Sequence, residues 1–242
     1  MEVNGSLVLH PRPNQSNGSC NSPLPPRTEQ ELLQRAEALA GLTVAACSQR
    51  LGVTVPANLL HNKGWVGQLL EQLLGASANS RQEPDFTEIG VELKTLPITH
   101  EGLPLESTYI CNVPLDEIIP TPWEKSWIRT KLQRVLWVPV IAEREIPLPQ
   151  RKIASPLLWS PSEEEERVLQ RDWSELMDRI WSGEVETISA RMGEVLQIRP
   201  KAAHSRIRTS AFNPQGEVIE VNPRGFYLRP GFTRYLLQHY FF

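Results

Sequence analysis

Helix-like and strand-like patterns follow one another along this chain without the regular strand–helix–strand alternation that builds a fully parallel sheet. Helices are predicted where apolar residues recur at helical spacing, and strands where apolar and polar residues alternate or a short apolar run is bounded by turn residues. The expected helices cover 28–41, 64–74, 160–183 and 231–240, and the expected strands cover 87–96, 107–113 and 134–142. This order predicts an α/β (α+β) fold with a central mixed β-sheet flanked by helices.

Two of the expected helices begin with capping signals. The Thr28 hydroxyl can accept from the amide of Glu31 while the Glu31 carboxylate reaches back, which is a capping box. Ser160 and Glu163 form a second such pair, with a proline at the first helical position. The acidic run 163–166 then lies in the first turns of that helix, where the helix dipole favours negative charge, so we interpret the run as structural.

The first part of the chain differs in composition from the rest. Residues 1–27 are rich in Asn, Ser, Gly and Pro and have no apolar periodicity, which predicts a disordered tail that contributes nothing to the core. Residues 28–242 then form one domain. The chain has 242 residues, 40% of them hydrophobic, which is enough for one core or for one core with two lobes.

Several classes of protein are disfavoured by what the sequence contains. Cys20, Cys47 and Cys111 are odd in number and far apart, so we expect unpaired thiols in a reducing compartment. The five histidines are scattered and indicate no zinc site. The longest apolar run, Val135 to Ala142, contains a proline and is too short to span a bilayer. We therefore expect a soluble, cytoplasmic protein without a membrane partner.

The charge distribution is uneven along the chain. The formal net charge is −3, so a role with nucleic acid has to depend on local charge. Residues 125–134 hold four basic side chains and no acid, and 199–234 hold seven against two acids, a local balance of +5. These stretches could line a basic cleft on an otherwise acidic molecule, or they could be scattered surface charges with no common face.

The segment from Asp85 to Lys94 carries the most chemical information. Glu92 and Lys94 are two residues apart on an expected strand, so their side chains leave the same face, and Asp85 arrives from the preceding loop. Two carboxylates can hold a hard divalent cation such as Mg²⁺, which stabilises charge on a phosphate and lowers the pKa of a bound water. The lysine can stabilise the transition state of phosphodiester hydrolysis. An Asp, a spacer and Glu-x-Lys are typical of the restriction-endonuclease superfamily.

The triplet alone is not specific, because acid-x-Lys on a strand is also an ordinary solvated face with an ion pair. Glu71 strengthens the nuclease interpretation, since it lies on the polar half of the helix just before the loop and could turn a third carboxylate toward the cation. Gly67, one turn earlier, leaves room for a metal or a backbone to approach. Without the triplet, Glu71 would be interpreted as an exposed helix glutamate.

Around these residues the sequence resembles the MutH family of mismatch-repair endonucleases. The similarity runs in order from about residue 28 to 240 and is far more specific than the triplet. The matching segments are Asn62 to Trp65, Leu69 to Glu71, Leu74 to Ala78, Gly90 to Thr95, Arg134 to Trp137, Ser155 to Pro161, Leu196 to Ala203 and Pro223 to Leu228. The sequence is less specifically similar to restriction enzymes that cut the four-base site GATC, which the MutH family also recognises.

The resemblance implies a restriction-endonuclease-like fold with two lobes around a DNA cleft. It implies a weak, latent, Mg²⁺-dependent monomer that nicks the unmethylated strand of double-stranded DNA at hemimethylated GATC. A MutL-like ATPase would activate it after MutS finds a mismatch. The alternatives that we keep open are a self-sufficient GATC restriction enzyme that cuts both strands and a DNA-binding module that no longer cleaves.

The resemblance also assigns roles to single residues. It implies that Glu71, Asp85 and Glu92 surround the metal, that Lys94 completes the catalytic site and that Lys131 lies near it. The residues that it implies to face DNA are Lys63, Tyr109, Arg199, Lys201 and Tyr227. The family would have Phe where Tyr109 stands, and either ring could stack or wedge between bases. The basic stretch 204–212 departs from the family and puts base contacts from that loop in doubt.

Tyr227 lies in Pro223-Arg224-Gly225-Phe226-Tyr227, where the flanking Pro and Gly suggest a shaped turn that projects one aromatic ring. Methylation adds an apolar group to adenine N6 in the major groove, and a rigid ring could clash with that group. Arg224 is close enough in sequence to anchor a phosphate and is counted among the expected DNA contacts. The alternative is that Phe226 and Tyr227 simply alternate along a strand, one buried and one exposed.

Overall fold

Strand β3 (Val135–Ile141) is buried along all but its last residue and organises the fold. The computed structural model describes residues 23–59, 64–78, 83–116, 119–201 and 206–241. Val135 and Trp137 of β3 belong to one hydrophobic core, whereas Leu136, Val138 and Val140 belong to another. Because successive side chains of a strand point to opposite faces, β3 separates the two cores and contributes to both.

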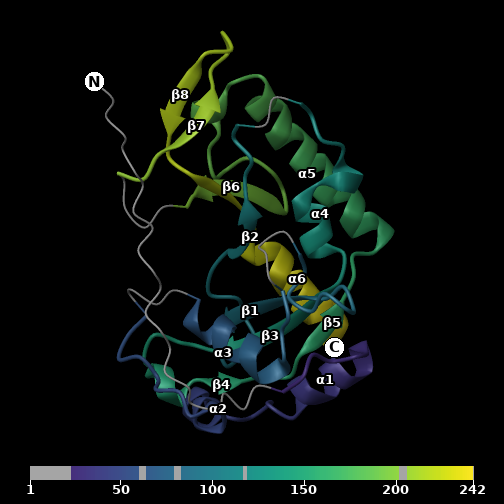
Figure 1. Cartoon of the computed structure of the whole chain (residues 1–242), viewed down its shortest axis with the longest axis vertical. Coiled ribbons are helices and arrows are strands. Elements are labelled where there is room, and N and C mark those ends of the chain that lie inside the picture. The colour runs from purple at the N-terminus through teal and green to yellow at the C-terminus, as the bar shows by residue number, and fades with distance from the viewer. Residues whose placement is uncertain (1–22, 60–63, 79–82, 117–118, 202–205, 242) are drawn as a thin grey trace, which may run out of the picture.

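The sheet around β3 is mixed. β1 (Glu92–Ile98) pairs with β3 in parallel, while β4 (Lys152–Ile153) and β5 (Leu157–Trp159) pair with β3 antiparallel. Helices α1 (Glu29–Glu37), α2 (Val44–Leu51) and α3 (Trp65–Leu74) lie beside it in the lower half of Figure 1. They fill the core that contains Leu136, Val138 and Val140. The predicted central mixed sheet flanked by helices is confirmed, and α2 is a helix that the sequence pattern did not predict.

A second lobe occupies the upper half of Figure 1. Its antiparallel sheet has the order β2 (Thr108–Asn112), β9 (Arg224–Leu228), β6 (Leu196–Pro200), and a separate hairpin joins β7 (Thr209–Phe212) to β8 (Val218–Val221). Helices α4 (Trp127–Leu132) and α5 (Glu163–Trp181) cover this sheet. Short 3₁₀ turns lie at Trp123–Lys125, Leu148–Gln150 and Val185–Thr187.

Helix α6 (Pro230–Phe241) runs between the two lobes in Figure 1. Phe232 and Leu236 enter the large core of the second lobe, and Leu237 packs with Leu96 and Ile98 of β1. This helix therefore joins the lobes through apolar contacts. In the part of the chain that the structure describes, no helix combines the length and apolar character needed to cross a membrane.

The residues before β1 differ from the sequence prediction. Thr87 to Gly90 form a turn, closed by the isolated bridge between Phe86 and Val91, and the strand begins only at Glu92. Gly90 has a φ of 66°, a conformation that favours glycine and is not compatible with a strand. The prediction of a strand from residue 87 is wrong, because alternation of apolar and polar residues also occurs in a tight turn.

The helix caps also differ in detail. Thr28 accepts from the Glu31 amide as expected, but the Glu31 carboxylate returns to the amide of Arg27. The capping box of α5 uses Ser162 and Glu165, two residues later than predicted, because Pro161 lies outside the helix. The end of α5 at Trp181, followed by Gly183 with positive φ, agrees with the prediction.

The chain is placed from Pro23 onward, five residues before the predicted start of the domain at residue 28. Pro26 is buried, and the Leu24 carbonyl accepts from Arg35 of α1 at 2.7 Å. Gly75 lies directly beneath this segment, since a Cβ there would come within 2.7 Å of the Leu24 oxygen. Residues 23–26 therefore pack on the domain. Residues 1–22 of the predicted tail lie outside the described residues.

Candidate active site

An open cavity of about 790 Å³, called the cleft below, lies where the two lobes meet. α3, β1, β2 and α4 contribute to its walls, together with the segment 23–25. The predicted site residues that line it are Glu71, Asp85, Glu92, Lys94, Tyr109, Lys131 and Lys201. Residues that are up to about 130 positions apart in sequence are thus brought to one space.

Glu92 is the most deeply buried charged side chain of the cleft, with 2% of its surface exposed. One carboxylate oxygen accepts from Lys94 Nζ at 2.6 Å, and the other accepts from Lys131 Nζ at 2.8 Å. Lys131 is itself buried and also donates to the carbonyl of Glu83. Two ammonium groups thus compensate a carboxylate that would otherwise be costly to bury.

Asp85 reaches the cleft from the loop before β1. Its Oδ2 accepts from the backbone amide of Leu93 at 2.8 Å, and its carbonyl accepts from the amides of Ser77 and Ala78. Asp85 is therefore tied through its carbonyl to the residues that follow α3 and through its carboxylate to β1. This local geometry places the carboxylate of Asp85 beside the strand that carries Glu92 and Lys94.

Glu71 lies on the cleft side of α3 and is half-buried. Gly67, one turn earlier, faces Glu71 and Thr95, but a Cβ added there would meet Glu71 Oε1 at 3.9 Å and Thr95 Oγ1 at 4.0 Å. These are ordinary contact distances, so the helix could approach β1 equally closely with alanine at 67. The expectation that Gly67 makes room for a backbone is therefore not supported, since alanine would fit as well.

The negatively charged carboxylates of the cleft repel one another. Burial raises the pKa of Glu71, and the nearby Asp85 raises it further. Burial likewise raises the pKa of Asp85, with a second contribution from Glu92, although the hydrogen bond from Leu93 acts in the opposite direction. Because charge on these groups is penalised in the metal-free protein, a cation in the cleft would relieve the repulsion.

The donor set suits a hard divalent cation, because Glu71, Asp85 and Glu92 offer only carboxylate oxygens. Among the described residues, however, no three acidic, histidine or cysteine side chains are gathered closely enough to hold a metal ion. Both oxygens of Glu92 are instead engaged by lysines. The three carboxylates therefore border one cleft without forming a closed ligand cage.

Tyr109 and Lys201 of the cleft wall adjoin a further aromatic ring and a further cation on the same face of the second sheet. Tyr109 of β2 and Tyr227 of β9 are paired residues, and their rings meet edge to face with centroids 5.4 Å apart. Lys201 Nζ lies 2.8 Å from the centre of the Tyr109 ring, and the Arg199 guanidinium lies 5.7 Å from the centre of the Tyr227 ring. We call these four residues, Tyr109, Arg199, Lys201 and Tyr227, the aromatic–cation face.

The remaining predicted DNA contacts are placed differently. Arg224 and Tyr227 are three residues apart on β9, so they leave opposite faces of the sheet. Arg224 donates to the Ile188 carbonyl at 3.1 Å, and burial lowers its pKa. The structure therefore does not bring Arg224 together with the aromatic–cation face. Lys63 lies outside the described residues.

The two basic stretches do not form one continuous face. In the stretch 125–134, Arg129 pairs with Glu166 at 2.6 Å and Arg134 pairs with Glu29 at 2.5 Å. Lys131 is the basic side chain of this stretch that lines the cleft. In the second, Arg229 donates to the carbonyls of Ala190, Met192 and Gly193. Much of the local positive charge therefore stabilises the fold.

Some residues of the site were not predicted from the sequence. Gln197 is buried beside the aromatic–cation face and donates to Ser107 Oγ at 2.8 Å, and Arg199 reaches the same hydroxyl at 3.4 Å. The period of two along β6 could have grouped Gln197 with Arg199. Cys111 is a free thiol that lines the cleft, and burial raises its pKa to about 12. Nothing in the sequence indicated its position. Cys47 is also free, and Cys20 lies outside the described residues.

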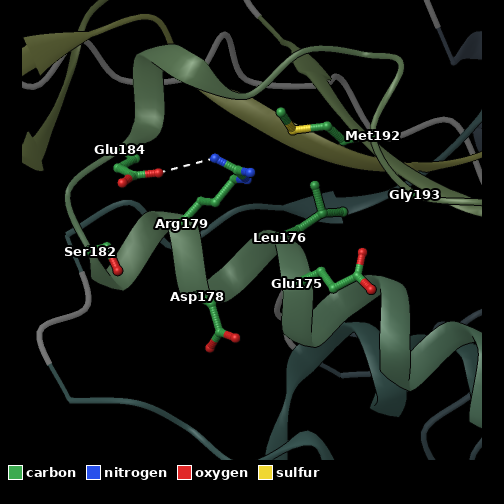
Figure 2. A pocket seen from close by; sticks show the side chains of 8 residues that line it. All are labelled: Glu175, Leu176, Asp178, Arg179, Ser182, Glu184, Met192 and Gly193. Atoms are coloured by element: carbon green, nitrogen blue, oxygen red, sulfur yellow. Dashed lines mark hydrogen bonds and ion pairs between the residues drawn. The ribbon is translucent and has the colours of Figure 1, made fainter.

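A second cavity, of about 460 Å³, lies against the C-terminal half of α5 (Figure 2). Glu175, Asp178 and Glu184 give it an acidic character, and Arg179 pairs with Glu184 at 3.0 Å. None of the predicted site residues lines it. The chemistry suggested by the sequence is therefore concentrated in the cleft between the lobes.

A mixed sheet that carries Glu-x-Lys at the edge of a cleft, with further carboxylates beside it, is the architecture of restriction-endonuclease-like nucleases. The family model described as "DNA mismatch repair enzyme MutH" matches residues 74–172. The DNA mismatch repair protein MutH of Yersinia enterocolitica is 56% identical over 219 residues, which cover 90% of this chain and 96% of that protein. The protein of the same name from Serratia proteamaculans is 54% identical and covers 91% of this chain and 96% of its own length. The Escherichia coli protein is 53% identical and covers 90% of this chain and 95% of its own length.

The chain therefore belongs to the MutH family of DNA mismatch repair enzymes. The predicted family, the predicted fold class and the predicted kind of enzyme, an endonuclease of mismatch repair, are confirmed. The roles of single residues, the metal and the partners remain predictions from the sequence.

Proposed function

We propose that this protein nicks the unmethylated strand of double-stranded DNA at hemimethylated GATC sites, with Mg²⁺ as its cofactor. It acts as a monomer in the cytoplasm, and a MutL-like ATPase activates it downstream of MutS. The observation that carries the proposal is the convergence of Glu71, Asp85, Glu92, Lys94 and Lys131 on one open cleft whose opposite wall is aromatic and basic.

The two walls of the cleft suit the two parts of a nucleic acid. Carboxylates and lysines on α3, β1 and α4 suit a phosphodiester that is to be hydrolysed, and aromatic rings with adjacent cations suit bases and their phosphates. Arg199 and Lys201 are exposed, so a polyanion can reach both side chains from solvent. This division supports a nuclease rather than a protein that only binds DNA.

On the chemical side, Asp85 and Glu92 would hold the metal, with Glu71 as a third acidic participant. The bound ion would stabilise charge on the phosphate and lower the pKa of a coordinated water. Lys94 lies beside Glu92 at the surface of the cleft and would stabilise negative charge that develops on the phosphate oxygens. Lys131 is more deeply buried and would keep the Glu92 carboxylate in place.

The contacts of Glu92 support a latent resting state. Each of its oxygens already accepts a hydrogen bond from a lysine, and one of those lysines is also held by a backbone carbonyl. A carboxylate satisfied in this way is a weaker metal ligand than a free one. An enzyme that rests in this state would need a partner or its correct DNA to reorganise the site.

On the recognition side, Arg199 would contact a base edge of GATC, and the Tyr227 ring would sense the adenine N6 position. Tyr227 is a strand residue, half-buried, with Phe226 behind it in the core, so the shaped turn expected around it is absent. Its ring is nevertheless held by Tyr109 and Arg199 on the cleft side of the sheet. A ring held on two sides can exclude a methyl group sterically.

The test is incubation of the purified protein with Mg²⁺ and circular DNA in three methylation states. We expect nicked circles from unmethylated and hemimethylated GATC and little product from fully methylated DNA. The Glu92→Gln variant should bind the same DNA without cutting it. Linear product that forms from unmethylated DNA without a nicked intermediate would indicate a self-sufficient restriction enzyme, and binding without any product by the unaltered protein would indicate a non-cleaving module. Either result would overturn the proposal.

A further inference from the structure

Gly225 lies in the middle of β9, directly between the two rings of the aromatic–cation face. A Cβ added at this position would come within 2.9 Å of Tyr109 Cε2 and within 3.2 Å of Tyr227 Cε2. Both rings therefore lean over the glycine and use the space where a side chain would be. Across the sheet, Gly225 is paired with Asn112 of β2, which lines the cleft, and with Arg199 of β6, which packs over the Tyr227 ring.

The backbone at Gly225 does not itself require glycine. It belongs to a regular strand, and its φ is not among the positive values found at nine other glycines. A side chain at 225 would thus be tolerated by the main chain and would act only on its neighbours. The requirement for glycine at this position comes from the two tyrosine rings and not from local conformation.

The ring of Tyr109 has little freedom to move in response. Its hydroxyl donates to Asn112 Oδ1 at 2.9 Å, its edge meets Tyr227, and the Lys201 ammonium covers one face. Displacing the ring would therefore disturb Lys201 and Tyr227 together. The positions of the Tyr109, Tyr227 and Lys201 side chains therefore depend on the absence of a Cβ at residue 225.

We propose that Gly225 is a specificity-determining positioning residue, because the missing side chain lets the Tyr109 and Tyr227 rings lie against the sheet where they can meet DNA bases. This inference rests on the proposed function, in which those rings contact DNA. Gly225 itself touches no substrate in this account. It acts through Tyr109 and Tyr227, so its substitution should alter affinity and methylation preference more than the chemical step.

The variant for the test is Gly225→Ala, and the matched control is Gly231→Ala in α6. Gly231 also lacks a positive φ, and a Cβ there would meet nothing within 4 Å. For Gly225→Ala we expect KM for unmethylated GATC duplex to rise about tenfold and kcat to change by less than about threefold. The ratio of nicking rates on unmethylated and fully methylated duplexes should fall about tenfold. Gly231→Ala should leave all three quantities unchanged.

A double-mutant cycle separates positioning from general damage to the fold. In a Tyr109→Leu background the ring that meets the new methyl group is gone, so most of the effect of Gly225→Ala should disappear. Full additivity of the two substitutions would contradict the inference. So would an unchanged methylation ratio in the single variant.

A measurement without DNA distinguishes failure of this inference from failure of the proposed function. The chain has four tyrosines, so selective ring labelling gives few NMR signals. We expect Gly225→Ala to shift the signals of Tyr109 and Tyr227 and to leave those of Tyr235 and Tyr240 in place. If the unaltered protein does not nick GATC, the proposed function fails while the ring shifts still test Gly225. Unmoved Tyr109 and Tyr227 signals would overturn the inference alone.

Discussion

Two carboxylates of the cleft, Asp85 and Glu92, have opposite electrostatic surroundings. Glu92 is compensated by two lysines, whereas the pKa of Asp85 is raised by burial and by Glu92. Replacing Glu92 by Gln should abolish nicking and also lower stability by about 1–3 kcal/mol, since buried Lys131 loses its carboxylate partner. Thermal unfolding and nicking of the same preparation measure both effects. An unchanged melting temperature would show that the ion pair contributes nothing.

Asp85→Asn should also abolish nicking, but with the opposite effect on stability. A raised pKa in the folded state means that the fold disfavours the ionised carboxylate. In metal-free buffer the Asn variant should therefore be more stable than the unaltered protein near neutral pH. This advantage should shrink as the pH falls toward 3.8, the ordinary pKa of the group, because Asp85 then becomes protonated in both folded and unfolded chains. Denaturant titrations at several pH values test the sign, and a less stable Asn variant at neutral pH would contradict it.

Lys94 differs from Lys131 in exposure, and this difference predicts separate kinetic effects. Lys94 is partly exposed to the cleft, so Lys94→Ala should lower kcat by roughly two decades and change KM little. Single-turnover nicking at saturating DNA measures the chemical step directly. If instead only the affinity changes, Lys94 belongs with the phosphate contacts on the other wall.

At the scale of elements, the segment 23–26 is part of the wall of the cleft. Pro23 and Pro25 line the cleft, Pro26 is buried, and the Leu24 carbonyl is held by Arg35. A chain that starts at residue 23 should melt and cleave like the full chain. A chain that starts at residue 28 should melt at a lower temperature and have a higher KM, because it loses both the packing and the wall. Equal melting temperatures and equal KM values for the two truncations would show that residues 23–27 belong to a tail that contributes nothing to the domain, as their composition predicted.

The long elements were predictable from the sequence, and the connections were not. α3, α5 and α6 follow from apolar periodicity because their buried faces are long enough to give a clear pattern, and β3 follows from its uninterrupted apolar run. The turn before β1 was mistaken for strand because its apolar residues also alternate. α2 is a short helix of eight residues with a capping threonine, and its pattern was too brief to be distinctive.

For the site, the sequence singled out residues that the structure brings together in the cleft, and the structure supplied their pairing. Spacing placed Glu92 and Lys94 on one face of a strand, and family resemblance suggested Lys131. That both lysines engage Glu92 depends on how α4 meets β1, a tertiary contact that no local pattern encodes. Arg224 was grouped with Tyr227 through nearness in sequence, yet the alternation of a strand sends the two side chains to opposite faces.

At the scale of the whole molecule, a chain with net charge −3 is proposed to bind a polyanion through one local face. Binding should therefore weaken steeply as salt increases. Lys201→Ala should reduce the slope of log Kd against log salt by about one, because one phosphate contact is lost. Arg171→Ala is a suitable control, since Arg171 of α5 pairs with Glu194 and does not line the cleft. Equal slopes for the two variants would remove Lys201 from the DNA-facing group.

The most direct test of the whole account is strand-resolved nicking of a duplex with a single hemimethylated GATC and a different label on each strand. With Mg²⁺, the unaltered protein should release product only from the unmethylated strand. The same protein in EDTA, and the Glu92→Gln variant with Mg²⁺, should release none. Equal cutting of both strands, or undiminished cutting by Glu92→Gln, would contradict the claim that this cleft performs metal-dependent, methylation-sensitive nicking.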